Sequence, residues 1–327
     1  MHATVLTVIL NYKTAAMTLR AAQAARVAME GVDGSITIVD NDSQDGSFEF
    51  LSRETSDWPE VRVIASGRNG GFGAGNNVGI RAGLPDGSRP DFVYLQNPDS
   101  FPDPDAIAIL RDHMLTHPEC GFAGSAIRGE DGKPHAAVFR FPSILSEIDS
   151  GAHTGVISRL LSDYRIVVEP TDQPCAAQWC SGASVMFRQD ALDQVGLFDE
   201  TFFLYFEETD LCRRIWQAGF TGAYVPQARS MHIGSVSTGM GTWKRVPKYW
   251  FDSRAHYFRK HHGSLYLGLV TLSYVSAAWL WRLRRMIERK EERIPPHFLR
   301  DLVGHTVQSL MPGATATQAN IGARKLP

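Results

Sequence analysis

Two acidic stretches of the chain, Asn97–Asp99 and Glu207–Asp210, carry side chains with the chemistry of a catalytic site. A carboxylate at Asp99 could hold a divalent cation, because hard cations prefer oxygen ligands and usually share them with substrate phosphates. Glu207 and Glu208 open a predicted helix behind an aromatic stretch, which would limit water and raise a carboxylate's pKa, as suits a general base. Taken singly, each acid could also be a turn residue or a partner of the helix dipole.

The two glutamates differ in direction. Adjacent residues point about 100° apart on a helix, so one can face a crevice while the other pairs with the scaffold. The sequence leaves open whether Glu207 or Glu208 is the base. His232 is a further candidate ligand if it reaches the same ion as Asp99, although a lone histidine is more often a buried or surface residue.

A glycine-rich segment and an early aspartate suggest where a nucleotide would bind. Residues Asn69–Gly79 include five glycines, which let a ligand approach the backbone and open a helix N-terminus toward anions. The segment fits neither the dinucleotide fingerprint nor the phosphate-loop motif, and a tight structural turn is the alternative. Asp40 could accept hydrogen bonds from a ribose or a base, or simply cap the turn at 40–47.

A regular alternation of strands and helices would bring these candidates together. We predict strands at 3–10, Ser35–Val39, Val61–Ala65 and Phe92–Leu95, and helices at 14–29, at about 47–55 and up to about Gly83. Such alternation implies a parallel sheet with right-handed crossovers. Ligands of these sheets bind beyond the carboxyl ends of the strands. The loops at those ends are 11–13, 40–47, 68–77 and 96–100.

The second half of the chain is less regular. Its predicted elements are a helix at 103–117, strands and turns over 121–143, a loop-rich insertion at 144–174, a strand at Trp179–Phe187, and helices at Asp190–Val195 and Thr209–Ala218. The final dozen or so residues read as a frayed end.

Composition limits the classes of function. The 327 residues are 43% hydrophobic and 21% charged, enough for a normal core. A formal charge of −2 disfavours electrostatic nucleic-acid binding. The four cysteines form no CxxC pair, so neither a zinc site nor a disulfide framework is indicated, and reduced thiols in the cytoplasm are the simplest reading. The N-terminus lacks the basic region and cleavage site of a signal peptide.

Taken together, the motifs resemble those of the inverting, GT-A-fold glycosyltransferases of family 2, and within them a bacterial rhamnosyltransferase-like branch. The resemblance covers about residues 3–262. Each motif is weak alone, but six in the right order are specific. The matching strings are Val8–Tyr12, Asp40–Ser47, Asn69–Gly79, Asn97–Asp99, Trp179–Ala183 and Phe198–Leu211.

This resemblance implies an α/β architecture of the GT-A type. A mostly parallel nucleotide-binding sheet flanked by helices would be fused to a mixed acceptor-side sheet and followed by a C-terminal helical tail. We expect a transferase domain at 1–262, with a nucleotide-sugar half at 1–100 and an acceptor half at 101–262, and a tail at 263–327.

The resemblance also implies roles for matched positions. Glu208 would deprotonate the acceptor hydroxyl, with Glu207 and Asp210 as supports. Asp99 and His232 would hold Mg²⁺ or Mn²⁺. The donor site would be formed by Asn11, Tyr12, Asp40, Asp42, Arg68, Asn69, Gly71, Asn76, Asn97, Trp179, Ser181 and Gly182.

Two positions depart from the family pattern. Asn97 replaces the first acid of the Asp-x-Asp metal motif, which implies one protein carboxylate and weak, exchangeable cation binding completed by the diphosphate. Glu208 stands where Asp is common and is one methylene longer, so the helix or the acceptor must shift.

The implied reaction is a single in-line displacement that inverts the anomeric centre. It would move rhamnose or a hexose from a nucleoside-diphosphate sugar to a glycan or polyprenyl-linked glycan, in cell-surface polysaccharide synthesis. One alternative is a sugar-1-phosphate nucleotidyltransferase, which needs a basic, glycine-rich loop where this chain has Asn11–Thr14. The other is a catalytically degenerate GT-A protein that serves as an assembly partner.

The tail contains Gly263–Trp281, which is uncharged over 19 residues and precedes an arginine-rich stretch at 282–300. Three interpretations are an interfacial or partner-packing helix, a buried helix or homodimer contact, and a membrane span. Aromatic ends and a basic flank suit a membrane surface. We therefore expect a cytoplasmic enzyme, peripheral on the inner face of the cytoplasmic membrane.

Overall fold

The computed structural model describes residues 3–234, 243–289 and 294–311. The chain forms two compact units. Unit 1 comprises Met1–Phe139, Glu169–Phe203 and Glu207–Gly239, and unit 2 comprises Arg140–Val168, Leu204–Phe206 and Met240–Pro327. The division expected at residue 262 stays a prediction, and the frayed end expected for the last dozen residues lies outside the described part of the chain.

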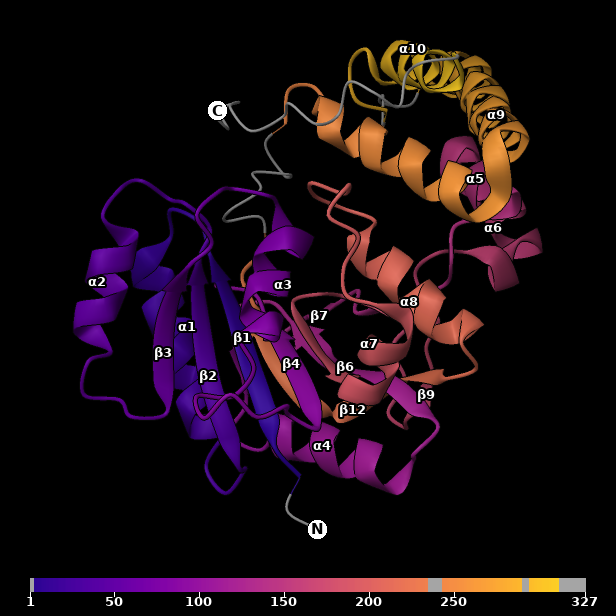
Figure 1. Ribbon diagram of the computed structural model, residues 1–327. Coiled ribbons are helices and arrows are strands. Elements are labelled where there is room, and N and C mark those ends of the chain that lie inside the picture. The colour runs from indigo at the N-terminus through magenta and orange to yellow at the C-terminus, as the bar shows by residue number, and fades with distance from the viewer. Residues whose placement is uncertain (1–2, 235–242, 290–293, 312–327) are drawn as a thin grey trace. The chain divides into compact units, whose positions relative to one another are not determined.

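Unit 1 is built on a large sheet whose first half is parallel (Figure 1). Its strands are β1 (Val5–Asn11), β2 (Gly34–Asp40), β3 (Val61–Ala65) and β4 (Phe92–Gln96). They are ordered β3-β2-β1-β4 and all pair in parallel. All seven residues of β1 are buried, which explains its continuous run of apolar and β-branched residues. The predicted alternation and its bounds are confirmed to within about two residues.

Helices α1 (Ala15–Ala28), α2 (Ser47–Glu54) and α3 (Phe72–Arg81) connect these strands. The buried face of α1 includes Ala21, Ala22, Ala25 and Ala28, whose small side chains let the helix pack closely. Because each crossover returns the chain to the same edge, the loops after β1, β2 and β4 all leave from the carboxyl ends of neighbouring strands.

The second half of the sheet is mixed, as expected. Its elements are β5 (Ser100–Pro102), α4 (Ala106–Thr116), β6 (Cys120–Arg128), β11 (Ser184–Arg188), α7 (Gln189–Val195), α8 (Glu207–Gln217) and β12 (Thr221–His232). Strand β11 is antiparallel to both β4 and β6, and β12 is parallel to β6 and antiparallel to β5. The short strands are β7 (Pro134–His135), β8 (Val138–Phe139), β9 (Cys175–Ala176) and β10 (Trp179–Cys180).

The single strand predicted at Trp179–Phe187 is wrong. Its first two residues form β10, which pairs with β8 in a separate two-stranded sheet, and the rest begins again as β11. The break is a turn in which the Ser181 hydroxyl accepts a hydrogen bond from Ala183 N at 3.3 Å. Small residues that favour such turns separate the two apolar pieces.

The loop-rich insertion predicted at 144–174 is also wrong. It contains α5 (Ile144–Ala152), α6 (Gly155–Leu160) and a 3-10 turn at Ser162–Tyr164. Helix α5 starts with a reciprocal cap in which Ser146 N donates to Ser143 Oγ and Ser143 N donates to Ser146 Oγ. Ser146 here takes the place of the more usual Glu or Gln of a capping box.

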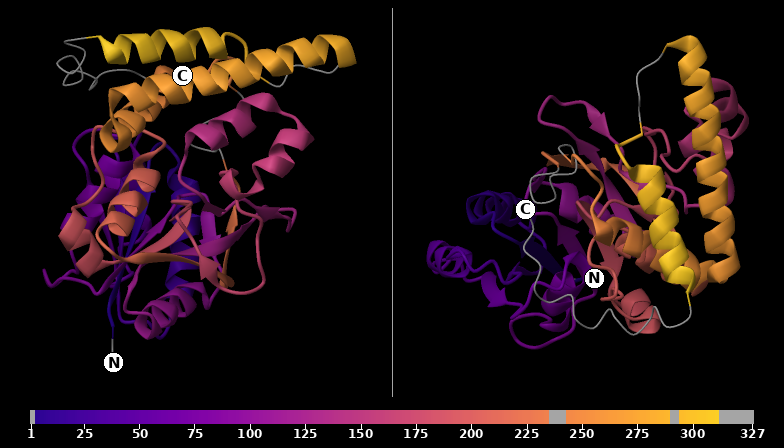
Figure 2. Two further views of the ribbon diagram at one scale, coloured as in Figure 1. Left: turned by 90° about the vertical axis from the view of Figure 1, so that its right-hand side faces the viewer. Right: turned by 90° about the horizontal axis from the view of Figure 1, so that it is seen from above.

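Unit 2 consists largely of helices, with α9 (Lys248–Glu288) and α10 (Phe298–Leu310) running alongside each other (Figure 2). Gly263 interrupts α9 with a non-helical backbone conformation, at φ 84°. The buried Arg254 donates to Glu147 at 2.7 Å and so ties α9 to α5. By length and composition, α9 could cross a membrane, although 28% of its apolar window is buried within the structure.

Candidate active site

The end of β2 forms a buried polar network with the end of β1. Asp40 Oδ1 accepts hydrogen bonds from Asn11 Nδ2 at 2.7 Å and from Ser43 Oγ at 2.6 Å, and Asp40 Oδ2 accepts from Ser43 N at 3.1 Å. Asn11 and Asp40 lie opposite each other in the β1–β2 register. The network fixes the turn at 40–47 at the carboxyl edge of the parallel strands. Asn11 and Asp40, which the sequence placed in one site, therefore touch.

Asn41 ties this turn to the glycine-rich segment. Its Nδ2 donates to Asn69 Oδ1 at 3.1 Å and to Gly71 O at 3.2 Å. Its Oδ1 is buried and accepts no hydrogen bond from the described residues. A buried hydrogen-bond acceptor without a partner costs free energy unless a ligand or a water molecule donates to it. The Asn41 Oδ1 atom therefore marks a position where a hydrogen-bond donor of a ligand would bind.

Gly71 must be glycine for two reasons. Its φ of 87° lies in the left-handed region, and a Cβ there would stand 1.8 Å from Phe203 O. The next residue, Phe72, begins α3 and donates its N–H to the same carbonyl at 3.0 Å. The glycine thereby joins the N-terminus of α3 to the segment that precedes α8.

The remaining predicted donor residues of the first half lie nearby but make mainly local contacts. Asp42 has a φ of 60° and accepts from Gln44 Nε2, whereas Arg68 is largely exposed and donates to Glu200 at 2.8 Å. Asn76 is buried and donates to Phe72 O within α3. The Lys13 ammonium group lies 5.1 Å from the centroid of the Tyr12 ring. Their assignment to the donor site stays a prediction.

Asn97, Asp99 and His232 come together where the segment between β4 and β5 meets the C-terminal end of β12. His232 Nε2 lies 3.2 Å from Asp99 Oδ1 and 3.5 Å from Asn97 Nδ2. Strand pairing explains the approach, because His232 lies opposite Ser100 in the β12–β5 register. Backbone groups hold the aspartate: Gly234 N donates to Asp99 Oδ2 at 3.2 Å, and Ile233 N donates to its carbonyl at 3.1 Å.

This cluster fits a divalent cation chemically. Asn97 Oδ1 is buried and accepts no hydrogen bond from the described residues, and Asp99 is 4% exposed with an oxygen directed at His232. Carboxylate and amide oxygens suit Mg²⁺ or Mn²⁺, and an imidazole suits the softer of the two. Among the described residues, no three or more His, Cys, Asp or Glu side chains are placed so that they could hold a metal ion, so Asn97 and substrate would have to complete the ligand set.

Glu208 lies against the turn that separates β10 from β11. A Cβ on Gly182 would stand 2.9 Å from Glu208 Oε1 and 3.0 Å from Phe72 Cζ, so a larger residue would force the carboxylate to shift from its observed position. Burial raises the pKa of the half-buried Glu208 carboxyl above its ordinary value, while backbone N–H groups of Glu208 and Gly182 oppose part of that rise. A raised pKa increases the basicity of the ionised carboxylate.

The neighbouring acids are placed differently. Glu207 is 1% exposed and therefore points into the scaffold. Asp210 is fully buried and accepts from Arg214 Nε at 2.8 Å, and Arg214 in turn donates to Val195 O and Leu197 O. Through Arg214, Asp210 thus anchors α8 to the loop after α7, and its predicted role in supporting the base stays a prediction.

The aromatic stretch before α8 divides between the units. Phe202 is buried in unit 1, whereas Tyr205 and Phe206 belong to unit 2 and pack on aromatic rings of α9, including Tyr249 and Tyr257. Both Tyr205 and Phe206 have a φ of 69°, an uncommon conformation for bulky residues. Within unit 1, Trp179 stacks on Phe139 with ring centroids 4.1 Å apart, and Ser181 N donates to Ala137 O.

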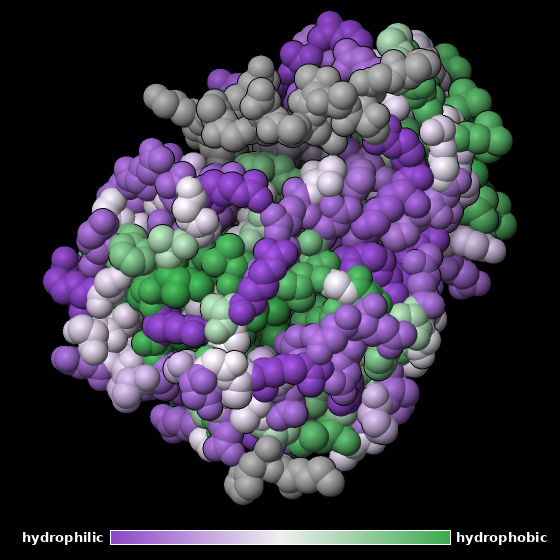
Figure 3. All heavy atoms as spheres, viewed as in Figure 1, coloured by the Kyte–Doolittle hydropathy of each residue, from purple (hydrophilic) through white to green (hydrophobic). Residues whose placement is uncertain are grey.

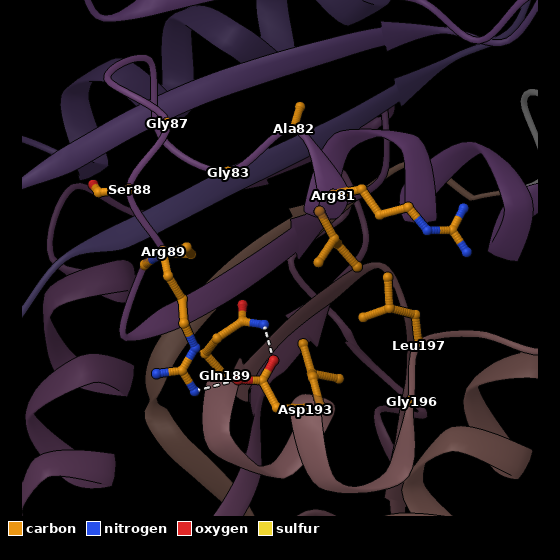
Figure 4. Close-up of a pocket in the computed structure, with 13 residues that line it drawn as sticks. Arg81, Ala82, Gly83, Gly87, Ser88, Arg89, Gln189, Asp193, Gly196 and Leu197 are labelled. Atoms are coloured by element: carbon orange, nitrogen blue, oxygen red, sulfur yellow. Dashed lines mark hydrogen bonds and ion pairs between the residues drawn. The ribbon is translucent and has the colours of Figure 1, made fainter.

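A separate cavity of about 420 Å³ lies at the C-terminal end of α3 (Figure 4). It is lined by the loop after α3 and by α7, with Arg81, Arg89 and Gln189 among its polar residues. Arg89 is committed to Asp193 at 2.5 Å, and Arg81 to Glu200 at 3.0 Å. None of the predicted site residues lines this cavity, so it is distinct from the candidate active site.

Comparison with known families decides the class of the protein. The family model described as "Glycosyl transferase family 2" matches residues 7–195, which is more than half of the chain. A second model, "Glycosyl transferase family group 2", matches residues 164–288. The chain belongs to glycosyl transferase family 2. It is therefore a glycosyltransferase, and the predicted family is confirmed.

Rhamnosyltransferases are among the relatives of this family 2 chain. It is 32% identical over 249 residues to the N-acetylglucosaminyl-diphospho-decaprenol L-rhamnosyltransferase of Mycobacterium tuberculosis, which covers 72% of this chain and 74% of that protein. It is 27% identical over 173 residues to the rhamnosyltransferase WbbL of Escherichia coli, covering 50% of this chain and 60% of that one. The rhamnosyltransferase-like branch is thereby confirmed.

Solved structures confirm the fold class. The mannosyltransferase PcManGT from Pyrobaculum calidifontis, in complex with GDP-Man and Mn²⁺, aligns with a TM-score of 0.55 at 13% identity, over 94% of this chain and 86% of that one. At this identity the likeness concerns the fold alone. It is the mixed α/β arrangement, with a mostly parallel central sheet, that the sequence predicted for a GT-A enzyme.

Several residues that shape the family 2 site were not singled out from the sequence. Ser43 and Asn41 hold the β2 turn, and Asn77 clips α3 to Phe198 by donating to its carbonyl and accepting from its N–H. The Glu200 carboxylate forms ion pairs with Arg68 and Arg81 and accepts a hydrogen bond from Asn77 Nδ2. All four residues lie inside the six matching strings, so membership of a motif was a signal for them. The partners cited for Asn41, Asn77 and Glu200 are remote in sequence, whereas Ser43 bonds to the nearby Asp40.

Proposed function

We propose that this enzyme transfers rhamnose or a hexose from a nucleoside-diphosphate sugar to a hydroxyl of a glycan or lipid-linked glycan, with inversion at the anomeric carbon. The observation that carries the proposal is the placement of Glu208: a half-buried carboxylate with a raised pKa, lying on the Gly182 backbone. The named relatives that are rhamnosyltransferases support the sugar class.

Glu208 is the base in this proposal. It accepts the proton of the acceptor hydroxyl while that oxygen forms a bond to the anomeric carbon. The bond between the anomeric carbon and the phosphate oxygen breaks, and the nucleoside diphosphate leaves with the electron pair. Glu208 is half-buried, whereas Glu207 is almost fully buried, which favours Glu208 as the residue that meets an acceptor.

The donor nucleotide would bind along the carboxyl edge of the parallel strands. Asp40, held by Asn11 and Ser43, would present its oxygens to the ribose or base. The Asn41 Oδ1 atom would accept a hydrogen bond from the nucleotide sugar. The N-terminus of α3, which follows Gly71, would bind an anionic group. Trp179, Ser181 and Gly182 would border the transferred sugar.

Asp99, His232 and Asn97 would hold a divalent cation beside the diphosphate. When bound, the cation would neutralise charge that develops on the leaving group. The Mn²⁺ in the mannosyltransferase structure supports this assignment, because that protein has the same fold. The cluster contains one protein carboxylate, so we expect exchangeable binding that the substrate's phosphates strengthen.

The names of the chain's relatives support a class of acceptor and a cellular site. The mycobacterial relative is named for a decaprenol-diphosphate acceptor, which supports a polyprenyl-linked acceptor here. Such acceptors lie in a bilayer, so we propose that this enzyme works at the cytoplasmic face of the membrane.

A transfer assay with product analysis tests the proposal. Purified protein is incubated with Mn²⁺, a panel of dTDP- and UDP-sugars, and a polyprenyl-diphosphate GlcNAc acceptor. We expect nucleoside-diphosphate release coupled to a product whose anomeric configuration, read by NMR, is inverted. Retention of configuration would overturn the in-line mechanism. A protein that neither transfers nor hydrolyses any donor would instead support the degenerate assembly-partner alternative.

A further inference from the structure

The part of α9 after Gly263 has two apolar faces, and unit 2 covers one of them. Leu267, Val270, Ala277 and Trp281 are buried. Trp281 and Ala278 form a core with Phe298 and Leu302 of α10, and Gly151 of α5 packs against Tyr274 and Ala277. At 100° per residue, the buried positions span an arc of about 120°.

The opposite side of this helix, which we call the outer face, is apolar and exposed. It comprises Leu265, Leu269, Leu272, Trp279, Leu283 and Met286, with exposed fractions between 44% and 79%. By the same geometry these residues fall within about 100°, centred almost directly opposite the buried arc. Figure 3 shows apolar side chains gathered along the outer edge of α9. A helix that is apolar on all sides but packed on one requires a second apolar environment.

Charge identifies the kind of environment. No Asp or Glu occurs from Ser253 to Ile287, whereas Arg259 and Lys260 precede the outer face and Arg282 and Arg285 follow its Trp279; Arg284 is paired with Glu288 at 2.6 Å. The Arg282 guanidinium lies 5.5 Å from the Trp279 ring centroid. An apolar stripe with basic ends and an aromatic residue beside them is complementary to an anionic lipid surface.

We infer that the outer face of α9 docks on an anionic lipid bilayer, with the helix lying along the surface. The helix does not cross the bilayer, because its opposite side packs against α5 and α10. A second copy of the chain is a poorer occupant, because helix pairs of this kind flank their apolar seam with residues of both charges, and acids are absent here. This inference goes beyond the transfer reaction and does not depend on it.

Vesicle co-sedimentation of the full chain tests the inference without any sugar substrate. The probes are vesicles of phosphatidylcholine alone and vesicles with added phosphatidylglycerol. We expect the wild type to pellet with the anionic vesicles and to bind neutral ones on the order of tenfold less tightly. Leu272→Asp should lower the partition coefficient about tenfold or more, because a leucine leaves the apolar phase and a like charge faces the lipid.

Controls separate docking from misfolding and from dimerisation. Leu115→Asp places the same change on an exposed leucine of α4 in unit 1 and should leave vesicle binding unchanged. Leu272→Ala, a milder change, should weaken binding by a smaller factor, with an unchanged far-ultraviolet circular dichroism spectrum. Equal pelleting of the wild type and Leu272→Asp would overturn the inference. So would a wild-type dimer in light scattering that Leu272→Asp converts to monomer while neither form binds vesicles.

Discussion

The Glu208 carboxylate packs directly on the backbone of Gly182: a Cβ at that glycine would stand 2.9 Å from Oε1 and 3.1 Å from Cγ. Side chains do not approach a carbon this closely, so the missing Cβ is what makes room for the acid. The contact joins the first turn of α8 to the turn between β10 and β11, which lies 26 residues earlier in the chain. The position of the proposed base therefore depends on both segments.

Gly182→Ala should impair transfer far more than stability. The added methyl group would displace the Glu208 side chain, and a misplaced base costs on the order of 100-fold in kcat. Michaelis constants for the donor should change less. Steady-state kinetics on Gly182→Ala would be compared with Gly304→Ala, where a Cβ meets open space and activity should be unchanged. Wild-type kcat in Gly182→Ala would show that Glu208 need not occupy its observed position.

The two adjacent glutamates should respond differently to neutralisation. Glu208→Gln removes the proposed proton acceptor and should lower kcat about 100-fold or more, with donor binding retained. Glu207→Gln changes a buried scaffold residue and should lower the melting temperature more than it lowers kcat. Paired measurements of kcat and Tm on both variants decide between them. The reverse pattern would assign the base to Glu207.

Glu208 should also make stability depend on pH. Its folded pKa is raised above 4.5, so folding favours the protonated acid. The cost of holding the charged form appears as pH rises from about 4.5 through the folded pKa and persists above it. Glu208→Gln should therefore raise Tm relative to wild type near neutral pH, and the difference should disappear below about pH 4.

The transfer rate should also depend on the ionisation of Glu208, but it should rise with pH where the stability falls. A base must be deprotonated, so kcat should fall as pH drops through the raised pKa of Glu208. Glu208→Asp should keep this acid limb at reduced rate, whereas Glu208→Gln should abolish it. An acid limb that persists in Glu208→Gln would assign the titration to another group.

Gly71→Ala should destabilise the fold by about 3 kcal/mol, because it combines left-handed strain with a clash against Phe203 O. Gly67→Ala is a matched control: its φ of 75° gives the strain, but no atom lies within 4 Å of the new Cβ. That variant should cost about 1 kcal/mol. Chemical denaturation of the two variants separates strain from clash, and equal losses would show that the Gly71–Phe203 contact relaxes freely.

The thermal shift caused by a nucleotide sugar should show whether a divalent cation helps to bind it. A nucleotide sugar at 100 times its dissociation constant stabilises a protein by about 2.7 kcal/mol, and Mn²⁺ should lower that constant in the wild type. Asp99→Asn should lose the Mn²⁺ dependence of the thermal shift while retaining the fold. The matched change Asp103→Asn, at an acid paired with Arg128 on the same edge, should keep it. Mn²⁺-independent stabilisation of the wild type would contradict the cation site.

Much of unit 1 was predictable because its signals are local. A short run of apolar and β-branched residues such as Val5–Leu10 favours a strand, and its alternation with helical segments favours a parallel sheet. The two wrong predictions also have local causes. The turn at Ser181–Ala183 lies between two apolar segments, so the whole stretch resembled one strand. The Ser143–Ser146 cap lacks the Glu or Gln that usually marks a capping box, so the start of the following helix was not recognised.

The sequence by itself determined the family, the alternating α/β order and the short set of acids and amides that line the carboxyl edge, because six ordered motifs encode them. Tertiary structure alone decided which of these side chains meet. Strand pairing brings His232 to Asp99, and the bare backbone of Gly182 admits Glu208. Such contacts depend on registers and packing between segments up to 133 positions apart, as Asp99 and His232 are, and no local pattern carries that information.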